Sequence, residues 1–143
     1  MNRCKRGNLS REHLQAFTLI EIVIVVAIVG ILMTIAMPAY QSYVLRVHRT
    51  QAIGALVLAS MCQESLYANN GSYDTNRCQP DFQGSRYQLS YSPKNTKGLS
   101  FTAMATPAGS QLDDPCGSLS LDQLGTRTVS AEDVSILKCW SGR

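Results

Sequence analysis

Five cysteines are the residues of this chain best suited to chemistry, as disulfides or as metal ligands: Cys4, Cys62, Cys78, Cys116 and Cys139. Cys4 lies in a basic amino-terminal stretch, which leaves an even set of four in the body of the chain. Zinc is the competing interpretation, but the chain has no C-x-x-C pair and only two histidines, His13 and His48. The even set therefore favours disulfides formed in an oxidising compartment, and three pairings are possible.

A single carboxylate, Glu21, interrupts an apolar run that extends from Phe17 to Met37. The run reads FTLIEIVIVVAIVGILMTIAM, and as a helix it has the length that crosses about 30 Å of hydrocarbon. An ionised carboxylate in such a segment costs several kcal/mol unless it finds a partner. Glu21 is therefore a candidate functional residue.

No arrangement of residues predicts catalysis. The sequence lacks G-x-S-x-G, H-E-x-x-H and a glycine-rich phosphate loop. Asp113 and Asp114 form a carboxylate pair beside Pro115, but without neighbouring ligands they are interpreted as turn residues rather than as a calcium or acid/base site. We expect no enzyme, no metal and no cofactor, and a membrane-anchored enzyme is the least favoured alternative.

The positive charge of the chain is concentrated at its amino terminus. The 143 residues carry a net charge of +3, yet four basic residues and only one acidic residue precede Phe17. Without residues 1–16, nine basic and nine acidic residues remain, so bulk charge gives no support to a dedicated nucleic-acid-binding protein. Because the basic stretch precedes the apolar run, we expect residues 1–16 in the cytoplasm and the rest outside it, in a single pass through the inner membrane.

A secretory signal and a plain membrane anchor are the ordinary alternatives for such a run. The run is longer than a typical signal core, and no convincing A-x-A site follows it. Glu21 argues against a plain anchor, because a charge inside a membrane helix is costly and a plain anchor gives it no function.

Helical spacing continues beyond the apolar run. It is carried by a stripe of small and apolar residues, Ala52, Ala55, Leu56, Ala59, Cys62 and Leu66. The pattern predicts one helix from Phe17 to about Tyr67, with a kink or local melting at Pro38. A helix that ends at Pro38 is the alternative.

Three basic residues, Arg46, His48 and Arg49, follow Pro38. They are interpreted as a solvated or headgroup-facing turn of this helix.

The pattern changes to short strands after the helix. Residues 87–91 and 99–105 alternate on either side of a turn at residues 92–98, which predicts a hairpin. Residues 118–122 and 126–129 predict a second one. The expected fold is α+β, a long amino-terminal helix packed on a small antiparallel sheet, with residues 72–86 as an irregular connection.

Ala16-Phe17-Thr18-Leu19-Ile20-Glu21 and the apolar run resemble the class III signal of type IV pilins and type II secretion pseudopilins. In that family a prepilin peptidase cuts before the phenylalanine and methylates the new amino terminus. The resemblance implies cleavage between Ala16 and Phe17, although Ala16 stands where the family usually has glycine, and an N-methylated Phe17. It implies that Glu21 pairs with the amine of a neighbouring subunit in a filament, and that the helix loosens near Pro38.

The resemblance also implies how the chain is organised. Residues 1–16 would be a removed leader, residues 17–37 the transmembrane and filament-core helix, and residues 38–70 its exported amphipathic half. Residues 71–143 would hold the connection, the sheet and a disulfide-closed final loop of a pilin-like fold. The partners implied are other pilin subunits, the inner membrane before assembly and the peptidase, with DNA as an alternative partner, and the destination is a cell-surface pilus.

The carboxyl half resembles small minor pilins, including subunits of DNA-uptake pili. The matching segments are Ala105–Gln111, Asp114, Cys116–Asp122, Gly125 and Cys139-Trp140. This resemblance favours a pilin for attachment, twitching motility or DNA uptake over a pseudopilin, which would have calcium ligands in place of a disulfide-closed loop. It implies that Cys116 pairs with Cys139, and Cys62 with Cys78.

A pilus-associated DNA receptor is a further alternative, because cations lie in and before the first predicted hairpin. Arg86, Lys94 and Lys97 could contact phosphates while Tyr87 or Tyr91 stacks on a base or sugar. The competing interpretation is a solvated turn with tyrosines in the core, and the neutral charge after residue 16 favours it.

Overall fold

The structure is a computed structural model, and it describes residues 17–78, 86–92 and 98–142. The chain divides into two compact units, Met1–Pro38 and Ala39–Arg143, and we describe each by itself.

The helix α1 (Leu19–Asn70) has 52 residues and contributes to both units. Thr18 precedes it, and its Oγ1 accepts the N–H of Glu21 at 3.3 Å, which caps the first turn. The N–H of Gly71 donates to the carbonyl of Tyr67 where the helix ends. The predicted single helix is confirmed, and the alternative of a helix that ends at Pro38 is wrong. The kink at Pro38 stays a prediction, because Pro38 ends the first unit.

In the first unit, α1 presents apolar side chains on every side. The large apolar residues between Leu19 and Met37 have exposed fractions from 45% to 82%. This part of α1 is long and apolar enough to cross a membrane. A helix that is apolar all round needs lipid or other helices around it.

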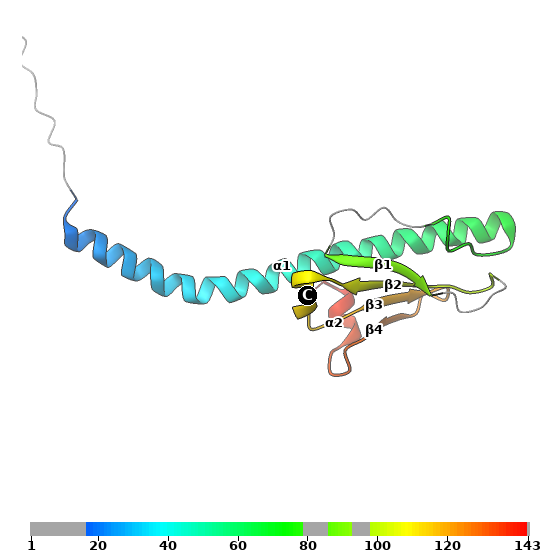
Figure 1. Ribbon diagram of the computed structural model, residues 1–143. Helices are drawn as coiled ribbons and strands as arrows, with labels where there is room; N and C mark the ends of the chain where they lie inside the picture. Colours follow the sequence, from blue (N-terminus) through cyan, green and yellow to red (C-terminus); the bar gives the residue numbers. More distant parts are fainter. Residues whose placement is uncertain (1–16, 79–85, 93–97, 143) are drawn as a thin grey trace, which may run out of the picture. The chain divides into compact units, whose positions relative to one another are not determined.

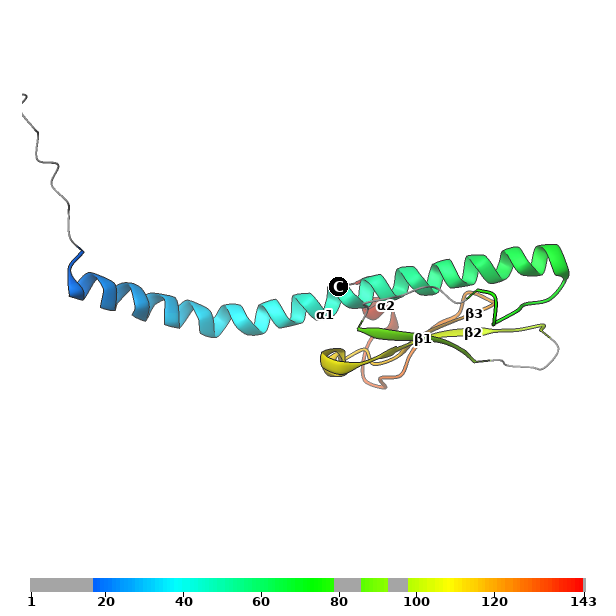
Figure 2. The same cartoon turned by 45° about the horizontal axis from the view of Figure 1, so that its top comes forward.

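In the second unit, a four-stranded antiparallel sheet lies alongside α1 (Figure 1, Figure 2). The strands are β1 (Tyr87–Ser92), β2 (Thr102–Pro107), β3 (Leu119–Asp122) and β4 (Arg127–Val129), and each pairs with the next. Both predicted hairpins are confirmed. The bounds of β1, β3 and β4 each differ from the predicted ones by one residue, and β2 shifts most, to Thr102–Pro107 instead of residues 99–105.

The core lies between α1 and the inner face of the sheet. Its buried members are Ala52, Leu56, Ala59, Tyr87, Phe101, Ala103, Ala105, Leu119, Leu121 and Trp140. Alanines on both surfaces bring the helix close to the strands, while Leu56 and Phe101 fill the remaining volume. The predicted stripe is confirmed from Ala52 to Ala59, but beyond it Cys62 is exposed.

A polar residue, Gln63, continues the buried face of α1 in place of Cys62. Its Nε2 donates to the carbonyl of Asp74 at 2.8 Å, and its Oε1 accepts the N–H of Asp74 at 3.0 Å. The amide thereby satisfies both backbone groups of Asp74, which ties the connection after α1 to the helix.

Two short elements were not expected, the 3₁₀ helix η1 (Gly109–Asp113) and the helix α2 (Ile136–Trp140). Each has five residues, too few to show a helical period in the sequence. The helix α2 packs against β4, and the indole Nε1 of Trp140 donates to the carbonyl of Thr128 at 3.3 Å.

Candidate functional site

The first unit carries the two residues expected to act in assembly, Phe17 and Glu21. Phe17 is 76% exposed. Glu21 is exposed in the first turn of α1, and it forms no ion pair with any residue in the described ranges. An apolar helix with one such carboxylate suits a bundle in which a neighbour supplies the positive charge.

In the second unit, the buried carboxylate of Asp114 is the centre of a polar network. Arg49 donates to it twice, from Nη2 to Oδ1 at 2.6 Å and from Nε to Oδ2 at 3.0 Å. The Tyr87 hydroxyl and the Gln111 Nε2 donate to Oδ2 at 2.8 and 2.7 Å. The N–H of Cys116 donates to Oδ1 at 2.9 Å. Donors from α1, β1, η1 and the segment after η1 thus converge on one side chain.

The donors decide the protonation state of this network. Burial alone raises the pKa of Asp114, but the hydrogen bonds from Arg49, Cys116 and Tyr87 and the charge of Arg49 outweigh it, so the pKa is lower than usual. Burial raises the pKa of Tyr87, and its hydrogen bond to Asp114 raises it further. The buried pair is therefore a carboxylate and a guanidinium, flanked by a neutral phenol.

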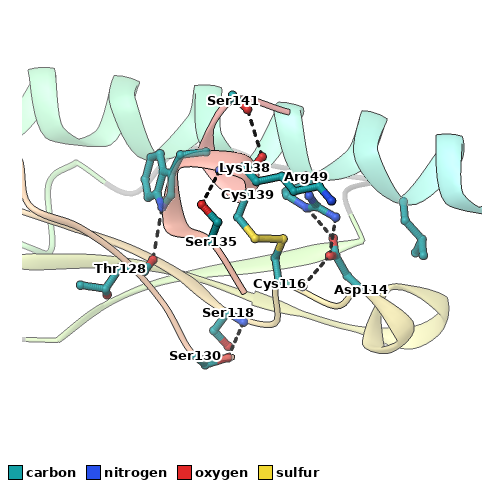
Figure 3. Close-up of a disulfide and its surroundings, with 12 residues drawn as sticks. Arg49, Asp114, Cys116, Ser118, Thr128, Ser130, Ser135, Lys138, Cys139 and Ser141 are labelled. Atoms are coloured by element: carbon teal, nitrogen blue, oxygen red, sulfur yellow. Dashed lines mark hydrogen bonds and ion pairs between the residues drawn. A yellow bond between two sulfur atoms is a disulfide. The ribbon is translucent and has the colours of Figure 1, made fainter. Parts of the chain in front are cut away.

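Two disulfides close the second unit, Cys62–Cys78 and Cys116–Cys139. The first ties α1 to the connection that follows it. The second joins the segment after η1 to α2, and Figure 3 shows it next to the pair of Arg49 and Asp114. The pairing implied by the resemblance to minor pilins is confirmed.

Tyr67 and Tyr73 form a stacked pair, here called the tyrosine pair, with ring centroids 4.7 Å apart. The N–H of Tyr73 donates to the carbonyl of Gly98 at 2.8 Å, which places the pair beside the start of the segment that leads into β2. Gly98 has a φ of +66°, and a Cβ there would lie 3.0 Å from the carbonyl oxygen of Tyr73, so glycine is needed at this approach. Tyr67 is 40% exposed, which leaves part of its ring available to a ligand.

Comparisons with known families cover most of the chain. Residues 38–120 match the family described as "Type IV minor pilin ComP, DNA uptake sequence receptor". The chain belongs to the type IV minor pilins. Residues 15–37 match the prokaryotic N-terminal methylation motif.

Individual relatives agree with this assignment. The pilin is 30% identical to a fimbrial protein of Moraxella nonliquefaciens, over 83% of its own length and 91% of that protein. It is 42% identical over 62 residues to a fimbrial protein of Neisseria meningitidis serogroup A, and this match spans 43% of the pilin and 36% of that protein's length. A solved type IV pilin from Shewanella oneidensis has a TM-score of 0.51 and 33% identity, and covers 64% of the pilin and 98% of the solved chain. The expected fold and the main functional hypothesis, a type IV pilus subunit, are therefore confirmed.

Of the candidate DNA-contacting cations, Arg86 lies in the described residues, and its grouping with Lys94 and Lys97 stays a prediction. Arg86 directly precedes β1, whereas the turn with Lys94 and Lys97 follows β1. Lys94 and Lys97 lie outside the described residues.

The tyrosines of β1 are not available for stacking on a ligand. Tyr87 is 2% exposed and belongs to the core, and the hydroxyl of the partly buried Tyr91 donates to the carbonyl of Cys78. The favoured interpretation, with the tyrosines in the core, is confirmed for Tyr87, and Tyr91 packs against that core. The tyrosine pair provides a partly exposed ring beside Gly98.

The sequence pattern also misplaced Arg49 and Asp114. Arg49, expected in a solvated or headgroup-facing turn, is 4% exposed, and Asp114 is equally buried. Arg49 precedes Ala52 by three residues and so continues the buried stripe, a signal that could have been used. Its partner lies 65 residues away, and no local pattern connects the two.

We predict that Asp114→Asn destabilises the second unit, because the amide leaves the buried Arg49 without a counter-charge. The free energy of unfolding should fall by about 3–5 kcal/mol, measured by urea denaturation with the disulfides intact. Asp113→Asn is the matched control at the exposed neighbouring position, and it should change stability by less than about 0.5 kcal/mol.

The same pair makes stability depend on pH. The folded-state pKa of Asp114 is below the unfolded value, so its contribution is present above the unfolded pKa and is lost as the pH falls through the folded pKa. Acid titration of the unfolding free energy should therefore show a steeper decline for the parent than for Asp114→Asn. Parallel curves for the two proteins would contradict this role of Asp114.

Proposed function

We propose that this minor pilin binds DNA at the surface of the pilus and serves in DNA uptake. The observation that carries the proposal is the match of residues 38–120 to a family described as a DNA uptake sequence receptor. The partly exposed tyrosine pair supports it, since an aromatic ring beside Gly98, which Lys97 precedes in the sequence, suits a nucleic acid.

The route to the pilus begins with processing. Residues 1–16 act as a leader that stays in the cytoplasm, and prepilin peptidase cuts between Ala16 and Phe17 and methylates Phe17. The match of residues 15–37 to the methylation motif supports this step. The two disulfides support an exported second unit, because they form in oxidising compartments. Between processing and assembly, the pilin resides in the inner membrane as a single-pass protein.

Assembly depends on Glu21. Cleavage leaves a positive amine four residues before it, and in a bundle of helices the carboxylate of one subunit pairs with the amine of the next. The pair relieves the buried charge only when the subunits are in register, so Glu21 aligns them. Pro38 loosens α1 as the subunit enters the filament.

DNA contacts on this surface are few. Lys94 and Lys97 supply two cations, and Tyr67 supplies a ring face. A carboxylate lies next to the tyrosine pair, since the Tyr73 hydroxyl donates to Glu64 at 3.1 Å. Its negative charge limits the attraction of phosphates to this surface. Binding by a single subunit is therefore weak and depends on salt.

Processing is tested by the mass of the mature chain. Intact mass spectrometry of protein extracted from membranes should find a chain that begins with N-methylated Phe17. A chain that retains Met1, or one cut beyond Met33, would overturn the proposed leader.

The alignment role is tested by replacing Glu21 without changing its shape. Glu21→Gln keeps a polar side chain in the first turn of α1 but removes the charge, so it should be processed and inserted normally yet be absent from sheared filaments. A tagged Glu21→Asp variant, which keeps the charge, should be incorporated at least in part. Filaments that contain the glutamine variant at the parent's level would remove the alignment role.

DNA binding is tested with the full chain in nonionic detergent, titrated with duplex at two salt concentrations. Lys94→Gln/Lys97→Gln should reduce the magnitude of the slope of log affinity against log salt by about 2, one phosphate contact for each lysine. Tyr67→Ala should weaken binding by about 1–3 kcal/mol, the range for one stacked base.

The matched control is Arg46→Gln/Lys138→Gln, which removes two cations from another surface. Arg46 precedes Tyr67 by 21 residues of α1, about 30 Å along the helix. Duplex affinity should not change in this variant. If the parent fails to bind duplex at low salt, the pilin is a filament subunit without a receptor role.

A further inference from the structure

A pocket of about 320 Å³ lies in the second unit between α1 and the carboxyl-terminal disulfide. Leu45, Val134 and the Cys116–Cys139 disulfide give it apolar walls. Two exposed cations, Arg46 of α1 and Lys138 of α2, also line it. Figure 3 shows Lys138 on the same short helix as Cys139, which forms the disulfide with Cys116.

The charges around this pocket are unbalanced. Arg49 also lines it, but its charge is neutralised by Asp114. Arg46 and Lys138 form no ion pair with another residue in the described ranges, and no carboxylate is among the described residues that line the pocket. The Nε of Arg46 donates to the carbonyl of Ser42 at 3.3 Å, which keeps the guanidinium along the pocket wall. Apolar walls with two cations suit an anion that is attached to an apolar group.

The neighbouring surface has the composition of a membrane interface. Tyr40 and Tyr43 are 69% and 59% exposed, and tyrosine is enriched where a protein meets the headgroups. Arg46 follows Tyr40 by six residues of α1, about 9 Å along the helix. Leu112 of η1 is 69% exposed, and its neighbour Gln111 donates to the carbonyl of Leu45 at 3.0 Å. Exposed aromatic groups thus lie on the turns of α1 at and before the pocket, and an exposed aliphatic group of η1 lies next to a residue that contacts Leu45.

We propose that this pocket binds the headgroup phosphate of an anionic phospholipid while the pilin resides in the membrane before assembly. Arg46 and Lys138 hold the phosphate, and Leu45 and Val134 contact the glycerol and the first methylene groups. The proposal rests on the membrane residence proposed above and is independent of DNA binding. The bound lipid holds the second unit against the headgroups, and its release accompanies entry into the filament.

The test uses the full, disulfide-bonded chain in nonionic detergent. Native mass spectrometry during titration with dioctanoyl-phosphatidylglycerol should show one lipid retained by the parent. Arg46→Gln and Lys138→Gln should each weaken retention about fivefold, the effect of one cation near an anionic lipid surface. Lys138→Arg keeps the charge and should retain the lipid. Arg77→Gln, which removes an exposed cation that does not line the pocket, is the matched control and should behave as the parent.

Two further ligands distinguish the source of the phosphate. Dioctanoyl-phosphatidylcholine should bind more weakly, because its choline repels the two cations, and inorganic phosphate should not displace the lipid, because it cannot use the apolar walls. Equal retention of both lipids, or unchanged retention in the Arg46→Gln and Lys138→Gln variants, would overturn the proposal. Displacement by inorganic phosphate would show a site for free anions instead.

The outcome is separable from that of the DNA proposal. Lys94→Gln/Lys97→Gln should retain phosphatidylglycerol as the parent does, whether or not it has lost duplex binding. If Arg46→Gln/Lys138→Gln loses duplex binding and keeps the lipid, the pocket is a DNA contact and the lipid proposal is wrong.

Discussion

The second unit of this pilin depends on one buried carboxylate, Asp114. Removing it from water is tolerable only because its oxygens accept five donors that come from four separate segments. The two parallel bonds from Arg49 also have a direction, since a guanidinium and a carboxylate meet edge to edge. Arg49 lies on the same stripe of α1 as Ala52 and Leu56, so the ion pair and the apolar core select the same helix face. The ion pair and the apolar packing therefore both fix which face of α1 lies against the sheet.

The two disulfides tie segments that are distant in sequence to each other around this small core. Cys116 donates its N–H to Asp114 and bonds covalently to Cys139 of α2, so the polar network and the carboxyl-terminal helix form one structure. The other disulfide ties α1 to the connection whose backbone Gln63 already satisfies. A small domain buries a modest fraction of its surface, and closing loops of this size adds about 3 kcal/mol for each bridge in the chain-entropy description. Disulfides of this kind persist in oxidising compartments.

Much of the fold could be predicted from the sequence because its main elements have strong periods. The stripe from Ala52 to Ala59 and the alternation in β1 and β3 are local signals, and each is confirmed. The elements that were missed are short or are held by distant contacts. The helix α2 has five residues, and its place is fixed by Cys139 and Trp140. Arg49 and Asp114 are 65 residues apart in the sequence. Each was interpreted alone, Arg49 as a headgroup contact and Asp114 as a turn residue, so their pairing was missed. The favoured interpretation of Tyr87 as a core residue is confirmed, although the buried partner of its hydroxyl is revealed only by the tertiary structure.

A chain with equal numbers of acidic and basic residues after Phe17 has no long-range field with which to collect anionic ligands. Recognition must then depend on where single charges are left unpaired. The fold neutralises Arg49 in the interior, and it leaves Arg46 and Lys138 without a carboxylate among the described residues around their pocket. The tyrosine pair lies about 30 Å further along α1 than Arg46, beyond the screening length of salt at physiological strength. Charges in these two regions therefore act independently, so the proposed lipid site and the proposed DNA contact can be gained or lost one at a time.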